Sequence, residues 1–384
     1  MNRKTILLIS VGFFWFAQYV YVPFQTPYLA AMNVGSKFIG IIVGTYGISQ
    51  MALRLPVGVL ADTQNRHKVI IVAGGAASGI ASLFRVILNN GMGFWAGNLF
   101  SGLASATWIS FMVLYMSYHS AKEQQKVTGQ IVLANNLGML AAFVLSTLLY
   151  DVIGMRWLCM MSVTGGAVCV VLSLFLPKGE QIKSEAKISS LLKICLQKRL
   201  ILFAVLALVQ QGVQMSTTMS FTTQIVKDLG ASGITVGLSS TVYMLSAVAF
   251  AKFATTDLCA KVGPAKWVPA IFVLNAAYCY LVPQCASFLV IFVLQILPGA
   301  STGILATYTI SEAMKNVPRE KKSTAMGFFQ AIYALGMTSF PIICGRIAEQ
   351  SSIGAAYIVM AGTCVAAAIA SGIYYRQLYK RMLA

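Results

Sequence analysis

The stretch from Gly58 to Lys68, GVLADTQNRHK, places an acid and two bases between two hydrophobic runs. Asp62 is followed four residues later by Arg66, and Lys68 comes two residues after that. A carboxylate and a guanidinium at this spacing can form an ion pair. Charged side chains avoid the interior of a membrane and collect at its surface. The stretch therefore predicts a charged latch on one face of a membrane.

The rest of the chain is apolar enough to lie in that membrane. Of its 384 residues, 58% are hydrophobic and only 10% are charged, and its mean hydropathy is +0.77. Soluble domains carry about 25% charged residues, whereas an apolar helix of about 20 residues spans a bilayer. The sequence predicts twelve spans, at 5–31, 37–60, 68–89, 92–118, 127–150, 156–176, 200–225, 233–254, 266–283, 286–312, 324–346 and 353–375.

The net charge of +18 is explained by orientation in the membrane. With both termini in the cytoplasm, 23 of the 28 lysines and arginines lie at or near cytoplasmic segments, and 5 lie toward the other side. Such asymmetry fixes the orientation of a membrane protein during insertion. We therefore expect a multi-pass protein of a prokaryotic cytoplasmic membrane, with both termini inside and no nucleic-acid partner.

The N-terminus and the cysteines could be mistaken for a signal peptide and for a disulfide or zinc framework. The N-terminal MNRKTILLISVGFFWFAQYV starts like a signal peptide, but its apolar run is too long and eleven further spans follow, so it is interpreted as the first span. The eight cysteines include no C-x-x-C pair, so neither a disulfide framework nor a zinc site is supported. No cofactor and no metal is expected.

The two halves of the chain repeat one plan. Gly35 and Asp62 recur as Gly230 and Asp257 at an offset of 195, where Lys261 also follows Asp257 as Arg66 follows Asp62. The offset rises only to 197 and 198 further on, where the matched pairs are Asn98 with Gln295, Gly102 with Gly299, Gly129 with Gly327, Leu137 with Leu335, Gly138 with Gly336, Met139 with Met337 and Asp151 with Glu349. The sequence thus predicts two six-helix bundles, at 1–176 and 200–384, joined by a basic cytoplasmic linker at 177–199.

The Gly58 to Lys68 turn resembles the signature loop of the major facilitator superfamily, which runs G-x-L-A-D-R-x-G-R-K between the second and third spans. The matching residues are Gly58, Leu60, Ala61, Asp62, Arg66 and Lys68, and the departures are Thr63, Asn65 and His67. The resemblance implies an all-α integral membrane fold of twelve helices in two pseudo-symmetric bundles. It also implies transport by alternating access, because the two bundles rock about a site near the midplane.

The same resemblance implies that Gly58, Asp62, Arg66 and Lys68 act in gating the cytoplasmic side. Asp257 and Lys261 would be their counterparts in the second half. The alternative is an ordinary exposed ion pair, which contributes well under ~1 kcal/mol.

In proteins of this resemblance, the first, fourth, seventh and tenth helices line the pathway. Polar and aromatic residues on these spans are therefore candidates for a substrate cavity, namely Gln18, Tyr19, Asn98, Gln211, Gln214 and Gln295. Each amide could instead hold two helices together, since hydrogen bonds between spans do so in membranes.

Two charged residues inside the spans are further candidates. Arg54 lies about two helical turns from Asp62 and either reaches the interface or faces a wet cavity, where it could contact an anion. Glu312, near the cytoplasmic end of the tenth span, is a candidate proton carrier or the partner of Lys315. Many proton-linked members carry an arginine near the position of Asn98, and this chain does not.

An enzyme is not expected, because the middle of the predicted spans holds no carboxylate, histidine or lysine. The first hypothesis is a secondary transporter that exports amphipathic or weakly polar solutes, as a monomer, with protons as a candidate coupling ion. The fifth span lacks the G-P-x-x-G-G pattern of many drug antiporters, which weakens multidrug efflux. The alternatives are uptake or exchange of an organic anion through Arg54 or Arg85, and a membrane sensor or scaffold that transports nothing.

Overall fold

The computed structural model describes residues 2–64, 66–119, 124–177, 193–254, 256–315, 317–318 and 322–383. Within these ranges, the side chains of 59–64, 124–129, 322–323 and 381–383 lie outside the description. The described chain is helical almost throughout and contains no strand.

The first six spans are built from seven helices. They are α1 (Arg3–Tyr19) and α2 (Val22–Ala31) in span 1, α3 (Ser36–Gln64) in span 2, α4 (His67–Leu88) in span 3, α5 (Gly91–Ala106) and α6 (Trp108–Ser117) in span 4, and α7 (Gln124–Leu174) in spans 5 and 6. Gly154 has a φ of 71° and breaks α7 into the two spans. A glycine adopts this left-handed conformation without strain.

The second half follows the same order. Span 7 comprises α9 (Lys198–Ser216), η3 (Thr217–Phe221) and α10 (Thr222–Asp228), and α11 (Gly233–Phe253) forms span 8. Span 9 is α13 (Pro264–Leu281) with η4 (Val282–Gln284). Span 10 comprises α14 (Phe288–Leu294), α15 (Ile296–Ala300), η5 (Ser301–Leu305) and α16 (Ala306–Met314), and the last two spans are α17 (Lys322–Gln350) and α18 (Ile353–Leu383).

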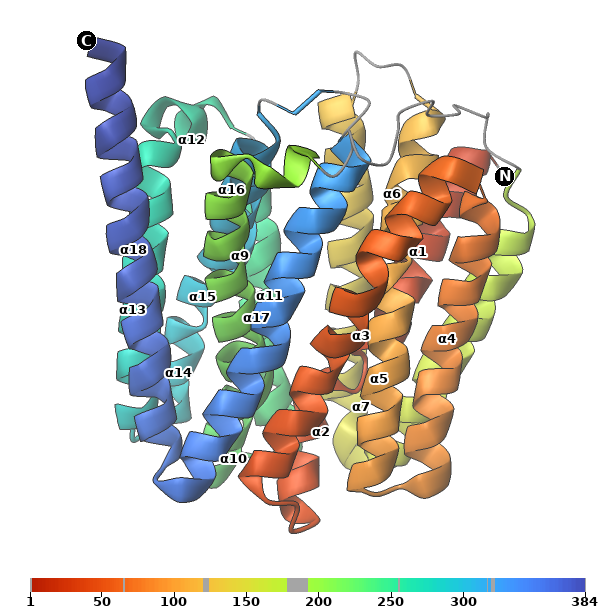
Figure 1. Ribbon diagram of the computed structural model, residues 1–384. Coiled ribbons are helices and arrows are strands. Elements are labelled where there is room, and N and C mark those ends of the chain that lie inside the picture. The colour runs from red at the N-terminus through yellow and green to blue at the C-terminus, as the bar shows by residue number, and fades with distance from the viewer. Residues whose placement is uncertain are drawn as a thin grey trace.

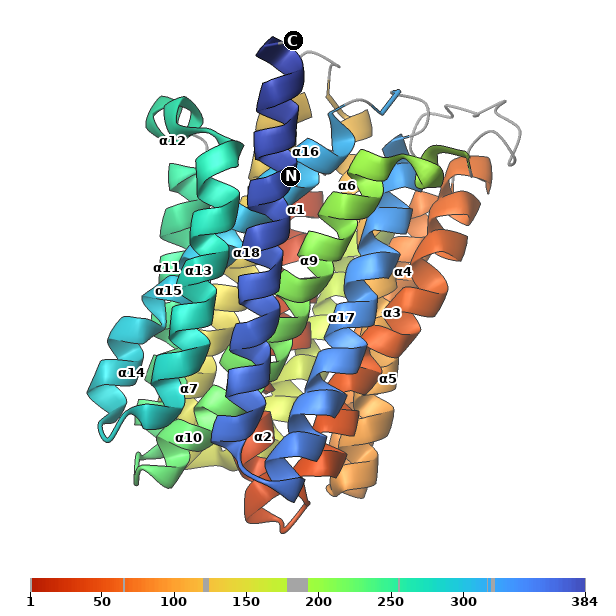
Figure 2. The same ribbon diagram turned by 60° about the vertical axis from the view of Figure 1, so that its left-hand side comes forward.

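The helices form two bundles that stand side by side (Figures 1 and 2). Spans 1–6 make the first bundle and spans 7–12 the second, and both chain termini lie at the same end. We call this end, which also holds the end of α3 at Gln64, the start of α4 at His67 and the short helix α12 (Asp257–Val262), the basic end. The opposite end holds the turns at 32–35, 89–90, 229–232 and 351–352.

The bundles meet along two helix pairs, α3 with α17 and α7 with α11. Small residues let these backbones approach closely, as helices in lipid require. A Cβ on Gly40 would collide with the carbonyl oxygen of Pro341, and one on Gly237 would collide with Thr147. Because Gly40 and Gly237 lie 197 residues apart, the two contacts are equivalent under the internal repeat.

Spans 1, 4, 7 and 10 are each interrupted near mid-length. Span 1 breaks between Tyr19 and Val22, and span 4 breaks at Thr107. Spans 7 and 10 each contain one π-helical turn, η3 and η5. These four spans are the ones that the sequence analysis assigned to the pathway. Irregular turns of this kind inside long helices frequently occur at functional sites.

The predicted fold class is confirmed, with eleven helices in the described residues long and apolar enough to span a membrane. One of them covers 45 residues and contains both span 5 and span 6. The short helix α12 was not expected, because only six residues form it. In the predicted linker, residues 178–192 lie outside the described residues and Lys193–Leu196 forms a 3-10 turn. The boundaries predicted for the two halves stay predictions.

Candidate functional site

An uncharged polar group lies at mid-depth in the first bundle. Gln18 in span 1 donates from Nε2 to the Ser101 carbonyl at 3.0 Å and to Ser105 Oγ at 3.5 Å. Ser105 in span 4 also shares a hydrogen bond of 2.6 Å with the hydroxyl of Tyr46 in span 2. An amide, a hydroxyl and a phenol from three helices thus form one buried group, which we call the first triad (Gln18, Tyr46 and Ser105).

The second bundle repeats this arrangement. Gln214 in span 7 donates from Nε2 to the hydroxyl of Tyr243 in span 8 at 2.6 Å. Tyr243 shares a hydrogen bond of 2.9 Å with Thr302 in span 10. Gln214 lies 196 residues after Gln18, and the other two members each lie 197 residues after theirs. This second triad (Gln214, Tyr243 and Thr302) is therefore the symmetry-related copy of the first.

Aromatic rings connect and line the two triads. The Tyr19 hydroxyl lies near those of Tyr46 and Tyr243, so one residue of span 1 is close to both triads. Trp15 lies one helical turn from Tyr19, with ring centroids 5.6 Å apart, and packs on Trp108 at 5.3 Å. Flat apolar walls beside a few convergent polar groups are typical of sites for small molecules.

Of the six triad members, only Gln18 and Gln214 were candidates from the sequence, together with the neighbouring Tyr19. Tyr46 and Tyr243 match at the same offset of 197 that relates Asn98 to Gln295. Ser105 and Thr302 also match at 197, with one hydroxyl replacing another. The repeat therefore carried the signal. Tyr46 and Tyr243 were missed because they lie outside the four pathway spans, whereas Ser105 and Thr302 lie on pathway spans and were not selected.

Asn98 and Gln295 are buried in a structural layer beside the triads. Asn98 donates from Nδ2 to the Ile42 carbonyl at 2.8 Å, and Gln295 donates from Nε2 to Ser239 Oγ at 3.0 Å. Ile42 and Ser239 are themselves 197 residues apart. Both amides therefore hold equivalent helix pairs together. Gln211 is partly exposed and donates to Gln210 Oε1 at 3.5 Å.

Arg85 occupies the centre of the layer in the first bundle. Its side chain is 1% exposed and donates to Asn98 Oδ1 at 2.7 Å, Ser101 Oγ at 2.9 Å and Ser82 Oγ at 3.0 Å. Its guanidinium also stacks on the Tyr21 ring at 3.9 Å from the centroid. Neutral groups thus solvate this charge, and in the described residues no carboxylate lies within ion-pair distance of it.

Arg54 joins the two bundles instead of reaching the interface or an open cavity. The side chain is 3% exposed. It donates to Gln330 Oε1 of span 11 at 2.6 Å and to the Tyr333 hydroxyl, and also to Gln50 of its own helix. The Tyr333 ring lies 4.9 Å from the guanidinium carbon. Arg54 therefore contributes to the contact between α3 and α17.

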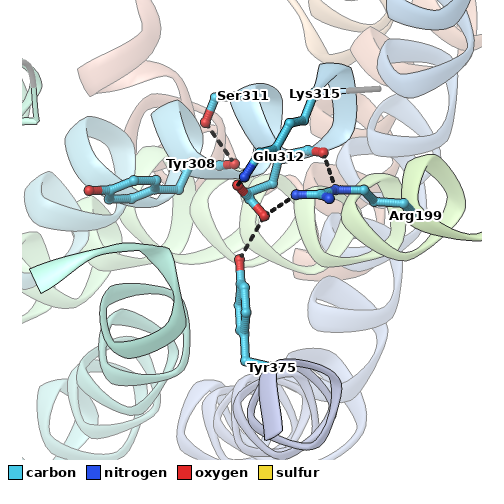
Figure 3. A network of polar contacts seen from close by, with 6 residues as sticks. All are labelled: Arg199, Tyr308, Ser311, Glu312, Lys315 and Tyr375. Carbon is cyan, nitrogen blue, oxygen red and sulfur yellow. Dashed lines mark hydrogen bonds and ion pairs between the residues drawn. The ribbon is translucent and has the colours of Figure 1, made fainter. Parts of the chain in front are cut away.

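Glu312 lies in an ion-pair network at the basic end of the second bundle (Figure 3). Arg199 at the start of span 7 donates from Nε to the Glu312 carbonyl at 2.7 Å and also binds its carboxylate. Tyr375 of span 12 donates to the same carboxylate at 3.5 Å, and Lys315 lies 3.9 Å from it. The expected Lys315 pair is present, but Arg199 is the closer partner. The network ties spans 7, 10 and 12 together.

The predicted latch at Gly58 to Lys68 is only partly described. Asp62 belongs to α3, but its side chain lies outside the described residues. Gly58 is buried, and Arg66 is exposed immediately before α4. Lys68 donates from Nζ to the Leu174 carbonyl at 2.7 Å, so it binds the C-terminus of span 6. A cation is stabilised there by the helix dipole.

The predicted counterparts in the second half have a different local structure. Asp257 and Lys261 are both exposed on α12, a helix with no equivalent in the described part of the first half. Neither residue takes part in an ion pair with another described residue. Asp257 lies in the first turn of α12, where a carboxylate is favourable, and Lys261 lies in its last turn. The pair therefore suits the dipole of its own helix.

The end opposite to the basic end carries a symmetric pair of acids that the sequence analysis had matched but not interpreted. Asp151 of the first bundle accepts a hydrogen bond of 3.0 Å from the Ile234 backbone N–H at the start of span 8. The Glu349 carboxylate of the second bundle lies against Gly35 at the start of span 2. Each acid thus contacts the N-terminus of a helix in the other bundle, and Cβ atoms on Gly35 or Gly233 would collide with these carboxylates.

Comparison with known proteins identifies the family. The model of the Major Facilitator Superfamily matches residues 7–225 and 203–382. The chain belongs to this superfamily. A relative in it, an uncharacterized MFS-type transporter of Methanocaldococcus jannaschii, is 22% identical over 363 residues, which are 91% of this chain and 90% of the relative. An uncharacterized transporter of Buchnera aphidicola is 34% identical over 94 residues, or 24% of each chain.

Solved structures of the superfamily share the fold over the whole chain. A crystal structure of the nucleoside transporter NupG aligns with a TM-score of 0.73 at 16% identity, and covers 98% of this chain and 99% of that one. A point mutant of NupG aligns with a TM-score of 0.77 at 15% identity, covering 96% and 99%. The likeness establishes a multi-pass membrane transporter fold. In the described residues, no cluster of His, Cys, Asp or Glu could hold a metal ion.

Proposed function

We propose that this superfamily member transports a small uncharged solute that combines hydrogen-bonding groups with a flat apolar face. The observation that carries the proposal is the pair of matched triads, one in each bundle, at mid-depth in interrupted helices. A solute held between the triads contacts both bundles, so rocking of the bundles would expose it to one side at a time.

The chemistry of the triads supports an uncharged solute. Their members are amides, phenols and hydroxyls. Gln18 Oε1 and Trp15 Nε1 are buried, and neither has a hydrogen-bond partner among the described residues. The first bundle therefore offers one free acceptor and one free donor at the site, beside aromatic rings. Unpaired buried polar groups strongly favour a ligand that satisfies them.

Nucleosides are suitable probes because they are neutral, carry several donors and acceptors, and have a flat base. The transporter with the shared fold, NupG, is described as a nucleoside transporter. Uptake of radiolabelled uridine into proteoliposomes tests the proposal. Gln214→Ala is expected to reduce uptake at least tenfold, since a hydrogen bond to a neutral buried group contributes about 1 kcal/mol and an orphaned partner costs about 1–3 kcal/mol more. Gln284→Ala, on an exposed turn, is the matched control.

An organic anion is the second candidate, since two buried guanidinium groups lie within the first bundle. Arg54 and Arg85 both already donate to protein acceptors, however. If the wild type takes up benzoate but not uridine, and Arg54→Gln loses the benzoate uptake, an organic anion is favoured as the solute.

We propose export as the direction and a proton gradient as the driving force, with the cytoplasm at the basic end. Everted membrane vesicles are then expected to accumulate uridine when energised. Accumulation by right-side-out vesicles would assign import instead.

A further inference from the structure

A small pocket lies inside the second bundle, behind the second triad. Spans 7, 9 and 10 enclose it, and its lining includes Gln214, Thr217, Asn275, Tyr278, Pro298 and Ser301. The two π-helical turns, η3 and η5, contribute Thr217 and Ser301. The pocket has room for one particle of about the size of a water molecule.

This pocket is lined by acceptors whose partners are missing. Asn275 is 3% exposed and donates from Nδ2 to Ser301 Oγ at 2.8 Å, while its Oδ1 has no partner among the described residues. Gln214 likewise donates to Tyr243, while its buried Oε1 has none. Buried oxygens of this kind are rarely left unsatisfied in native proteins. Two of them in one pocket indicate an occupant that interacts with oxygen.

Two hydroxyl groups of the pocket, those of Thr217 and Tyr278, use their protons elsewhere and present lone pairs. Thr217 donates its proton to the Val213 carbonyl at 2.7 Å. Tyr278 donates its proton to Gln295 Oε1 at 3.2 Å. The unpaired hydrogen-bonding groups around the pocket are thus mainly oxygen acceptors. The oxygens of Asn275, Gln214 and Thr217 are therefore suited to coordinate a cation.

Two residues that contact a buried cation in the first bundle have counterparts that line the pocket in the second bundle. The Arg85 guanidinium stacks on Tyr21 and donates to Ser101. Tyr21 corresponds to Thr217 at the offset of 196 that relates Gln18 to Gln214, and Ser101 corresponds to Pro298 at 197. Both counterparts line the pocket. Residues that surround a positively charged side chain in one bundle thus correspond to residues that line the pocket in the other bundle.

From these observations we propose that the pocket binds a monovalent cation, Na⁺, through the neutral oxygens of Asn275, Gln214 and Thr217. Interrupted helices at mid-membrane depth coordinate Na⁺ through neutral backbone oxygens in other transporter folds. Gln214 belongs to the second triad as well, so the ion would orient an amide of the proposed solute site. The inference does not rest on the proposed solute, because ion binding can be measured alone.

Thermal unfolding of the purified protein in NaCl, KCl and choline chloride at equal ionic strength tests the proposal. We expect the Tm to rise with Na⁺ concentration and not with the other two cations, because a ligand of the folded state stabilises it by mass action. Thr217→Val and Asn275→Ala should each abolish this shift. Ser216→Ala is the matched control, since Ser216 donates to the Gly212 carbonyl at the same 2.7 Å but does not line the pocket.

Two results would overturn the proposal. An equal effect of all three salts would mean that the pocket holds only water. A Na⁺-specific shift that survives in both Thr217→Val and Asn275→Ala would place the ion elsewhere. Binding of radioactive Na⁺ to each folded variant provides the second measurement if a substitution lowers the Tm. Uridine uptake that needs no Na⁺ would leave the transport proposal intact in either case.

Discussion

The contact between the bundles at the end opposite to the basic end can be weakened without changing any helix. Asp151 and Glu349 each place a carboxylate at the N-terminus of a helix in the other bundle, at Ile234 and Gly35. Asp151→Asn with Glu349→Gln removes both charges and keeps the size of both side chains. We expect this double variant to open that end of the protein more often.

The size of the effect follows from the helix dipole. A carboxylate at a helix N-terminus contributes about 0.3–1 kcal/mol when exposed, and both acids are exposed. Loss of two such contacts is worth about 0.6–2 kcal/mol. Since about 1.4 kcal/mol is a factor of ten, the population ratio of open to closed states should rise about 3-fold to 30-fold.

Electron–electron distance measurements between spin labels can detect this shift. Val152 on α7 and Leu289 on α14 belong to different bundles, and their side chains are 81% and 63% exposed. Asp228→Asn is the control, because among the described residues Asp228 accepts a side-chain hydrogen bond only from Gln224 in its own helix. The account predicts a larger fraction of long distances in the double variant alone. Identical distributions in the double variant, the control and the wild type would refute the role given to the two acids.

Four further outcomes are expected. Gly237→Ala should lower the Tm because the new Cβ collides with Thr147, whereas Gly372→Ala should not, since no described atom lies within 4 Å of that Cβ. Equal Tm values for the two variants would contradict the close approach of α7 and α11. Asn98→Ala should cost about 1–3 kcal/mol of stability by removing an acceptor of Arg85, with little change in the solutes transported. An altered substrate preference with an unchanged Tm would instead indicate that Asn98 contacts the solute. Glu312→Gln should cost about 1–3 kcal/mol because it removes the charge that Arg199 binds, and a wild-type denaturation midpoint would argue against the network. Burial raises the pKa of the Cys195 thiol above its ordinary value, so its thiolate is scarcer at pH 7 than that of a free cysteine. In a variant with no other cysteine, the rate of reaction with maleimide should therefore still be rising above about pH 9. A rate that reaches a plateau below about pH 8.5 would contradict a raised pKa.

Much of the fold could be predicted because hydrophobicity and repetition are properties of the sequence itself. Long apolar segments required spans, and the repeat of Asn98 as Gln295 required two related halves. The interruptions of spans 7 and 10 were harder to foresee. The turns η3 and η5 depend on hydrogen bonds such as that of Thr217 to Val213, and many ordinary helices contain the same residue types.

The candidate site was predicted in part. Gln18 and Gln214 were selected because they are polar residues deep in pathway spans. Tyr46, which hydrogen-bonds to Ser105, and Tyr243, which accepts from Gln214, lie on spans 2 and 8, which were not assigned to the pathway. Arg54 was expected to reach the interface or a wet cavity, and its true neighbours on span 11 are 276 and 279 residues away. Pairings over such distances depend on how the bundles pack, which one sequence does not specify.

Counterflow of uridine in proteoliposomes tests the central claim most directly. Vesicles preloaded with unlabelled uridine should transiently accumulate labelled uridine, because an alternating-access protein exchanges solute between its two sides. The account predicts this transient for the wild type and for Gln284→Ala, and a loss of at least tenfold in Gln18→Ala and Gln214→Ala. A transient of wild-type size in both triad variants would contradict the claim that the two triads hold the solute.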